Sequence, residues 1–167
     1  GFACLISGNE EEGRRHVSEV CDYTADFSVS KDTLADDYIK GIVDKEGIKA
    51  IFMRVDDTRD SLVKKRQALE TVLKRSPKFR EGLFSLAGTW LQLHRSGEAL
   101  SVLERYHAID PTNATVEYYL AELYKERLDY NQAWQHLRNA EKLSKERDHE
   151  PKVLLELAKD LAALCPE

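Results

Sequence analysis

Histidines, cysteines and paired carboxylates are the side chains of this sequence that could catalyse a reaction or hold a metal. The 167-residue chain has five histidines and three cysteines, but neither an HExxH motif nor a CxxC pair brings them to metal-binding spacing. The sequence also has no glycine-rich phosphate loop and no GxSxG nucleophile turn. Each histidine is expected to be a surface or half-buried helix residue, and adjacent carboxylates, such as Asp36 with Asp37, are ordinary on helix surfaces. We therefore predict a protein that is not an enzyme and that has no cofactor and no metal site.

Composition is ordinary for a soluble helical protein and argues against nucleic-acid binding and membrane insertion. Charged residues make up 33% and hydrophobic residues 42%, with only eight glycines and four prolines. A net charge of −5 disfavours general nucleic-acid binding, which needs a surplus of Lys and Arg, and no apolar run reaches the roughly 20 residues of a membrane span. The odd number of cysteines predicts three free thiols in a reducing, cytoplasmic environment, with a Cys4–Cys21 bridge as the credible exception.

Pro77 and Pro111 are 34 residues apart, and the residues that follow them repeat. The repeated pattern reads Leu83-x2-Leu86-Ala87-x2-Trp90 with Ala99-x3-Leu103, and then Glu117-x2-Leu120-Ala121-x2-Tyr124 with Ala133-x3-Leu137. This resembles the tetratricopeptide (TPR) repeat, whose 34-residue unit is a pair of antiparallel helices. The resemblance implies an all-α fold in which helix hairpins stack into a right-handed superhelix.

The expected helices are regular after residue 77 and irregular before it. Regular helices are expected over 78–93, 97–108, 112–127, 130–145 and 151–164. Gly97 and Asp129 are expected to mark the turns within the hairpins, and Thr112 or Asn113 is expected to cap the helix after Pro111.

Residues 46–77 fit the repeat only partly. They are expected to hold a helix through Ile48, Phe52 and Val55 and another over 60–75. Before them, a loop is expected over 22–31 and a helix over 31–44, with Ser30 as its cap. This helix is either an extra element or half of a drifted repeat.

The chain is predicted to be one TPR-like domain over 1–167, with irregular repeats over 1–77 and regular repeats plus a terminal helix over 78–167. At the start, Gly8-Asn9 is expected to form a turn between two helices of a partial hairpin. Because Gly1 already falls inside an expected helix, we expect a fragment of a longer protein. The last helix is expected either to cap the stack or to mark another cut.

First helices of TPR hairpins line a concave groove, and the matching positions are the predicted partner-binding residues. They are Phe84, Gly88, Leu91, Tyr118, Glu122, Lys125, Leu155 and Lys159. The resemblance implies an apolar strip with a charged rim, which accepts an extended peptide or a partner helix. The alternative is that the apolar members only pack against neighbouring helices. Trp90 and Tyr124 occupy the family's buried aromatic position and are expected in the core.

A non-enzymatic protein–protein interaction scaffold is the leading functional prediction. TPR co-chaperones grip acidic C-termini through converging cationic and amide donors. This chain has Phe84, Gly88 and Tyr118 at those positions, and only Lys152 and Lys159 carry suitable charge. The alternatives are a secretion-type chaperone that holds an unfolded substrate and a docking or regulatory domain of a larger enzyme. An RNA-binding helical repeat is disfavoured by the net charge.

Overall fold

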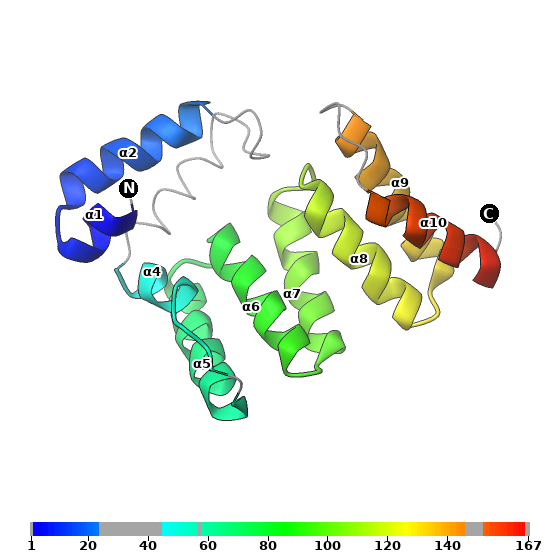
Figure 1. The fold of residues 1–167 in the computed structure, drawn as a ribbon, viewed down its shortest axis with the longest axis horizontal. Coiled ribbons are helices and arrows are strands. Elements are labelled where there is room, and N and C mark those ends of the chain that lie inside the picture. The colour runs from blue at the N-terminus through cyan, green and yellow to red at the C-terminus, as the bar shows by residue number, and fades with distance from the viewer. Residues whose placement is uncertain (1, 24–44, 57, 146–151, 166–167) are drawn as a thin grey trace. The chain divides into compact units, whose positions relative to one another are not determined.

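The computed structural model describes residues 2–23, 45–56, 58–145 and 152–165, and every regular element within these ranges is an α-helix (Figure 1). The helices are α1 (Phe2–Ser7), α2 (Glu10–Tyr23), α4 (Lys45–Ile51), α5 (Arg59–Arg75), α6 (Arg80–Gln92), α7 (Ser96–Ile109), α8 (Ala114–Glu126), α9 (Tyr130–Lys145) and α10 (Lys152–Leu164). The predicted all-α class of antiparallel helix hairpins is confirmed. The predicted helix over 31–44 and its cap Ser30 lie outside the described residues.

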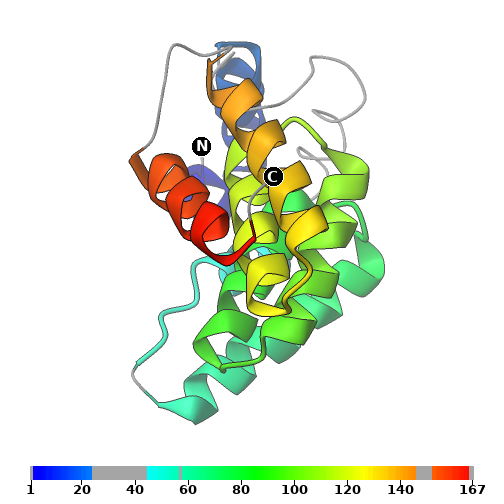
Figure 2. The same cartoon turned by 90° about the vertical axis from the view of Figure 1, so that its right-hand side faces the viewer.

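The chain divides into two compact units, Gly1–Ile109 and Asp110–Glu167, and each is described by itself. The first unit contains the hairpins α1–α2, α4–α5 and α6–α7, and the predicted boundary at residue 77 falls inside it. The second contains the hairpin α8–α9 with α10 packed on α9, which Figure 2 shows side by side in orange and red. From α5 onward, every predicted helix lies within two residues of its expected bounds.

The hairpins α6–α7 and α8–α9 turn in the same way, which extends the sequence repeat to the backbone. Each turn has one residue with positive φ, His94 at 57° and Leu128 at 63°. The N–H of Leu128 donates to the carbonyl of Lys125 at 2.9 Å, and the N–H of Asp129 donates to that of Tyr124 at 3.0 Å. The turn after α6 has the equivalent pair of bonds, so both first helices end in a Schellman motif.

The residues that start the second helices differ from one hairpin to the next. Asp129 precedes α9 as predicted, and its carboxylate accepts from the N–H of Gln132 at 3.2 Å. Gly97 was expected in the other turn, but it lies inside α7, because His94 provides the left-handed residue there.

Asn113 caps α8, since its side chain accepts from the second and third N–H groups of the helix, at 3.0 and 3.2 Å.

The hairpin at the start of the chain has the predicted turn. Gly8 has a φ of 94°, which suits glycine, and Asn9 follows it before α2 begins. The N–H of Asn9 donates to the carbonyl of Cys4 at 2.9 Å, which ties the end of α1 to the start of α2. Helix α2 continues to Tyr23, so the first two residues of the predicted loop over 22–31 are helical.

The predicted helix through Ile48, Phe52 and Val55 is wrong in its extent. Helix α4 ends at Ile51, and Phe52 is 55% exposed. The ammonium of Lys65, on α5, donates to the carbonyl of Ile51 at 2.9 Å and to that of Met53 at 3.4 Å. The helix thus ends beside contacts with a residue 12 to 14 positions away, which the local apolar pattern does not show.

One polar pair lies in the core of the second unit. Glu117 is fully buried and His136 is 7% exposed, and His136 Nδ1 lies 2.7 Å from Glu117 Oε2. Asn139 adds a longer bond to the same oxygen, at 3.4 Å. The His136 ring also stacks on Tyr124, with the ring centroids 5.4 Å apart. His136 was expected at the surface or half-buried, so its burial corrects the sequence analysis.

Candidate partner-binding site

Helix α6 carries a strip of three predicted partner-binding residues, of which Phe84 is exposed and Gly88 and Leu91 are half-buried. Phe84, Gly88 and Leu91 are spaced by four and three residues, so they share one face of the helix. Phe84 is 38% exposed, and its ring meets the buried ring of Tyr106 edge-on, with the centroids 6.3 Å apart. A Cβ atom added to Gly88 would meet no heavy atom within 4 Å, so the surface above it is open. The strip therefore has one anchored aromatic ring beside free space.

The buried face of the same helix leaves no such space. A Cβ atom added to Gly82 would lie 2.6 Å from Cδ1 of Phe79 and 3.3 Å from Cδ2 of Leu73. Phe79 is 1% exposed and Leu73 is 5% exposed, so both are held by their surroundings. Gly82 is thus needed for the close packing of α6, whereas Gly88 is not.

This contrast makes a matched pair of alanine substitutions informative. Gly82→Ala is expected to lower the free energy of unfolding by about 1–3 kcal/mol through overpacking. Gly88→Ala is expected to raise it by about 0.5–1 kcal/mol, because alanine is the better helix former and nothing obstructs it. Urea unfolding followed by circular dichroism measures both. Equal stabilities would show that α6 does not present these two faces as described.

Helix α8 of the second unit presents three more of the predicted first-helix residues. The hydroxyl of Tyr118 donates to Oε1 of Glu122 at 3.4 Å, and its ring packs on the buried core of this unit. Lys125 Nζ lies 2.9 Å from Glu122 Oε2 and 3.6 Å from Asp160 Oδ2, on α10. These contacts link Tyr118, Glu122, Lys125 and Asp160 into one polar row.

The environment of this row shifts two pKa values. Burial, followed by the Glu122 carboxylate, raises the pKa of the Tyr118 phenol, so it stays protonated and able to donate. Burial disfavours the charged form of Lys125, but its bonds to Glu122 and Asp160 outweigh this and raise its pKa. Lys125 is therefore a charged group already engaged by two carboxylates. It is poorly placed to serve in a clamp for a partner's carboxylate, in agreement with the sequence analysis.

Sequence analysis did not select Asp160. It stands at the repeat position of Thr89 and Leu123, which are both buried, so the repeat indicates packing there. Leu155 is 54% exposed and Lys159 is exposed as well. Asp160 contacts Lys125 of α8. At about 100° per residue, Lys159 lies about 100° and Leu155 about 140° around the helix from Asp160. The described contacts of the second unit therefore join Asp160, but neither Leu155 nor Lys159, to the polar row.

The two aromatic residues expected in the core, Trp90 and Tyr124, are each only half-buried. Trp90 lies under the guanidinium of Arg66, 5.1 Å from the ring centroid, in a cation–π contact. Tyr124 packs beside the core and stacks on His136. Tyr124 thus contacts the core of its unit, and both side chains remain partly accessible.

Comparison with known proteins supports the fold and leaves the family open. No protein-family model matches the sequence, and no curated protein matches it. Among solved structures, the chain is similar to MamA AMB-1 C2221, with a TM-score of 0.52 and 14% identity over 86% of this chain and 94% of that chain. It is also similar to the MamA RS-1 ArsTM double mutant, with a TM-score of 0.49 and 20% identity over 97% of this chain and 88% of that one. A third is MamA 41-end from Desulfovibrio magneticus RS-1, with a TM-score of 0.49 and 18% identity over 97% and 89% of the two chains. At 14% identity, the likeness to the first of these structures shows the fold alone, a TPR-like arrangement of helix hairpins.

Proposed function

We propose that this protein is a non-enzymatic scaffold that binds a peptide or helix of another protein along its first-helix residues. The observation that carries the proposal is the strip on α6, where Phe84 stands beside the open surface of Gly88. Aromatic side chains with free space beside them are typical anchors at protein interfaces. Tyr118, at the equivalent repeat position on α8, gives the second unit a candidate aromatic anchor of its own.

The remaining predicted residues take different parts in this proposal. Leu91 and Leu155 add apolar area to the aromatic anchors. Glu122, Lys125 and Lys159 provide a charged rim, which governs selectivity and the rate of association more than affinity. Among the described residues, no helix combines the length and apolar character that a bilayer crossing requires. The cytoplasmic location belongs to the proposal as well, with the free thiols of Cys4 and Cys165 in its support.

A capture experiment with folded variants tests the proposal. Phe84→Ala and Tyr118→Ala are each expected to weaken capture of a protein partner at least tenfold, because a well-buried aromatic anchor contributes about 2 kcal/mol or more. Phe52→Ala is the matched control, since Phe52 is an exposed phenylalanine outside the predicted strip. Quantitative pull-down, with circular dichroism on every variant, gives the measurement. Partners retained by both folded variants would exclude the first-helix surface as the binding site.

A secretion-type chaperone is the second candidate, and exposed apolar residues on α10 favour it. Val153 is 45% exposed, Leu155 is 54% exposed and Leu164 is 57% exposed. Such residues are available to an unfolded chain as well as to a folded partner. In the capture experiment, a chaperone would retain many unrelated unfolded proteins, whereas a scaffold would retain a defined set.

A further inference from the structure

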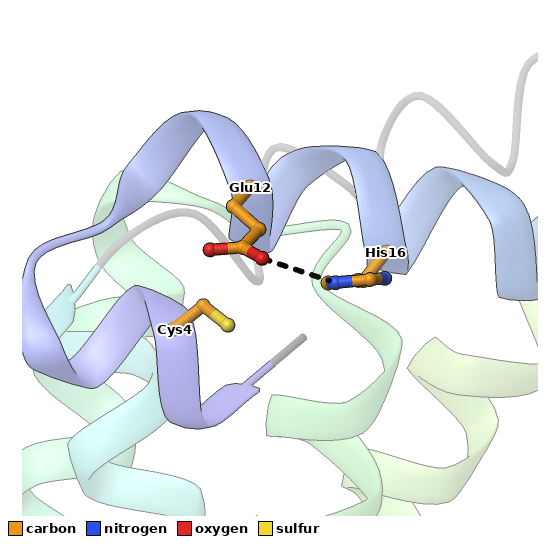
Figure 3. A group of neighbouring side chains, drawn as sticks. All are labelled: Cys4, Glu12 and His16. Carbon is orange, nitrogen blue, oxygen red and sulfur yellow. Dashed lines mark ion pairs between the residues drawn. The ribbon is translucent and has the colours of Figure 1, made fainter.

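We propose that Cys4, Glu12 and His16 bind a divalent transition-metal ion of the zinc type. Figure 3 shows the three side chains converging from α1 and α2. One ligand atom of each, the thiol sulfur, a carboxylate oxygen and a ring nitrogen, lies within 4.8 Å of the other two. His16 Nε2 is 3.7 Å from Glu12 Oε1. Nothing in the proposed binding function requires this cluster.

The local fold positions all three groups. Glu12 and His16 are four residues apart on α2, so they share one face of the helix. The Gly8–Asn9 turn folds α1 back and brings Cys4 to the same face. The Asn9 amide donates to Glu12 Oε2 at 2.6 Å, while the other oxygen, Oε1, is the one closest to His16. A second residue that holds a ligand in orientation is a common feature of metal sites.

The donor set matches zinc. Thiolate, imidazole and carboxylate bind Zn²⁺ at roughly 2.0–2.3 Å, so their atoms lie about 3.3–3.8 Å apart around the ion. Atoms within 4.8 Å of one another reach this spacing through small side-chain rotations. A thiolate also favours zinc over magnesium or calcium, which prefer oxygen ligands. Three protein ligands leave the fourth tetrahedral position to water. Binding transfers the Cys4 thiol proton to solvent.

Such an ion would add a link between α1 and α2 beyond the turn and its backbone hydrogen bond. Helix α1 has six residues, which is too short for independent stability in water. A metal bound to Cys4 on α1 and to two residues of α2 favours the closed hairpin, because binding stabilises only the folded arrangement. The sequence analysis predicted no metal site. A turn separates Cys4 from Glu12, and the spacing of the three residues in the sequence does not show that this turn brings them together.

Thiol protection provides the first test, on the full reduced chain. Zn²⁺ is expected to slow alkylation of Cys4 at least tenfold, while Cys165, a free cysteine of similar exposure, reacts at an unchanged rate. Peptide mapping by mass spectrometry reports each cysteine separately. Equal rates for Cys4 with and without Zn²⁺ would overturn the proposal, as would equal protection of both cysteines.

Cobalt substitution provides the second test. One Co²⁺ per chain is expected to give a sulfur-to-cobalt charge-transfer band that Zn²⁺ abolishes. The band should disappear in Cys4→Ser and persist in Cys165→Ser. His16→Asn should weaken Co²⁺ binding at least tenfold, whereas His94→Asn, at an exposed histidine whose φ of 57° asparagine accepts, should not. Absence of the band in the wild type, or its persistence in Cys4→Ser, would exclude this site.

Discussion

Replacing His136 by alanine is expected to lower the free energy of unfolding by about 3–5 kcal/mol, because it removes the 2.7 Å hydrogen bond between His136 Nδ1 and the buried carboxyl group of Glu117. Asn139 donates to the same carboxylate only at 3.4 Å and does not replace that bond. His136→Asn is the matched variant, since its amide places a donor close to the position of Nδ1. It should recover part of the loss. Urea unfolding of the three proteins measures the difference.

The neighbouring repeat suggests a double variant that removes the Glu117–His136 pair and keeps the surrounding core packed. Leu83 stands where Glu117 does, and Val102 stands where His136 does, and both are buried. The double variant Glu117→Leu with His136→Val should therefore restore stability to the wild-type level or above, because well-packed apolar residues often replace a buried polar pair without loss. The two single variants should each be much less stable. Additive losses in the double variant would show that the two residues do not act as a pair.

The same comparison shows what the sequence reveals about the core. Glu117 and His136 are the two polar residues that replace Leu83 and Val102 within one repeat. Two polar substitutions at packed positions of one hairpin indicate a buried contact between them. Sequence analysis treated each histidine separately, so it placed His136 near the surface. Reading the repeats against each other supplies the missing signal.

Helix positions after residue 77 followed from the sequence because their determinants are local. The apolar spacing, the caps and the prolines lie within or beside each helix, and the helices begin and end within two residues of the predicted bounds. Before residue 77, helix α5 was predicted to within one residue, but the end of helix α4 was not. Helix α4 stops at Ile51, where Lys65 binds the carbonyls from 14 residues away. No local pattern contains that information.

Among the candidate binding residues, too, some features follow from the local sequence and others depend on contacts between helices. The exposure of Phe84 and the open surface at Gly88 agree with the first-helix pattern, which depends only on helix periodicity. Asp160 was missed because its contact with Lys125 joins two helices of the second unit. Its repeat position, buried in α6 and α8, indicates packing instead. Contacts between helices depend on how far apart the hairpins lie, which the repeat pattern does not specify.

Ala121→Leu is expected to lower the free energy of unfolding of this protein by about 1–3 kcal/mol. Ala121 has no exposed surface and belongs to the core cluster of α8, α9 and α10, together with Ala133, Leu137 and Leu157. Two small residues, Ala121 and Ala133, allow α8 and α9 to approach closely, and Ala87 and Ala99 repeat this arrangement in the first unit. A leucine adds three carbon atoms where no space exists.

The control for this prediction is the same substitution where the helix faces solvent. Ala163→Leu, at an exposed position of α10, should change the free energy of unfolding by less than about 0.5 kcal/mol, because leucine and alanine are both good helix formers. Urea unfolding followed by circular dichroism compares the two variants directly. If Ala121→Leu is as stable as Ala163→Leu, then α8 and α9 do not cross closely at Ala121. The alanines of the 34-residue pattern would then have no packing role, and the repeat register taken from them would be wrong.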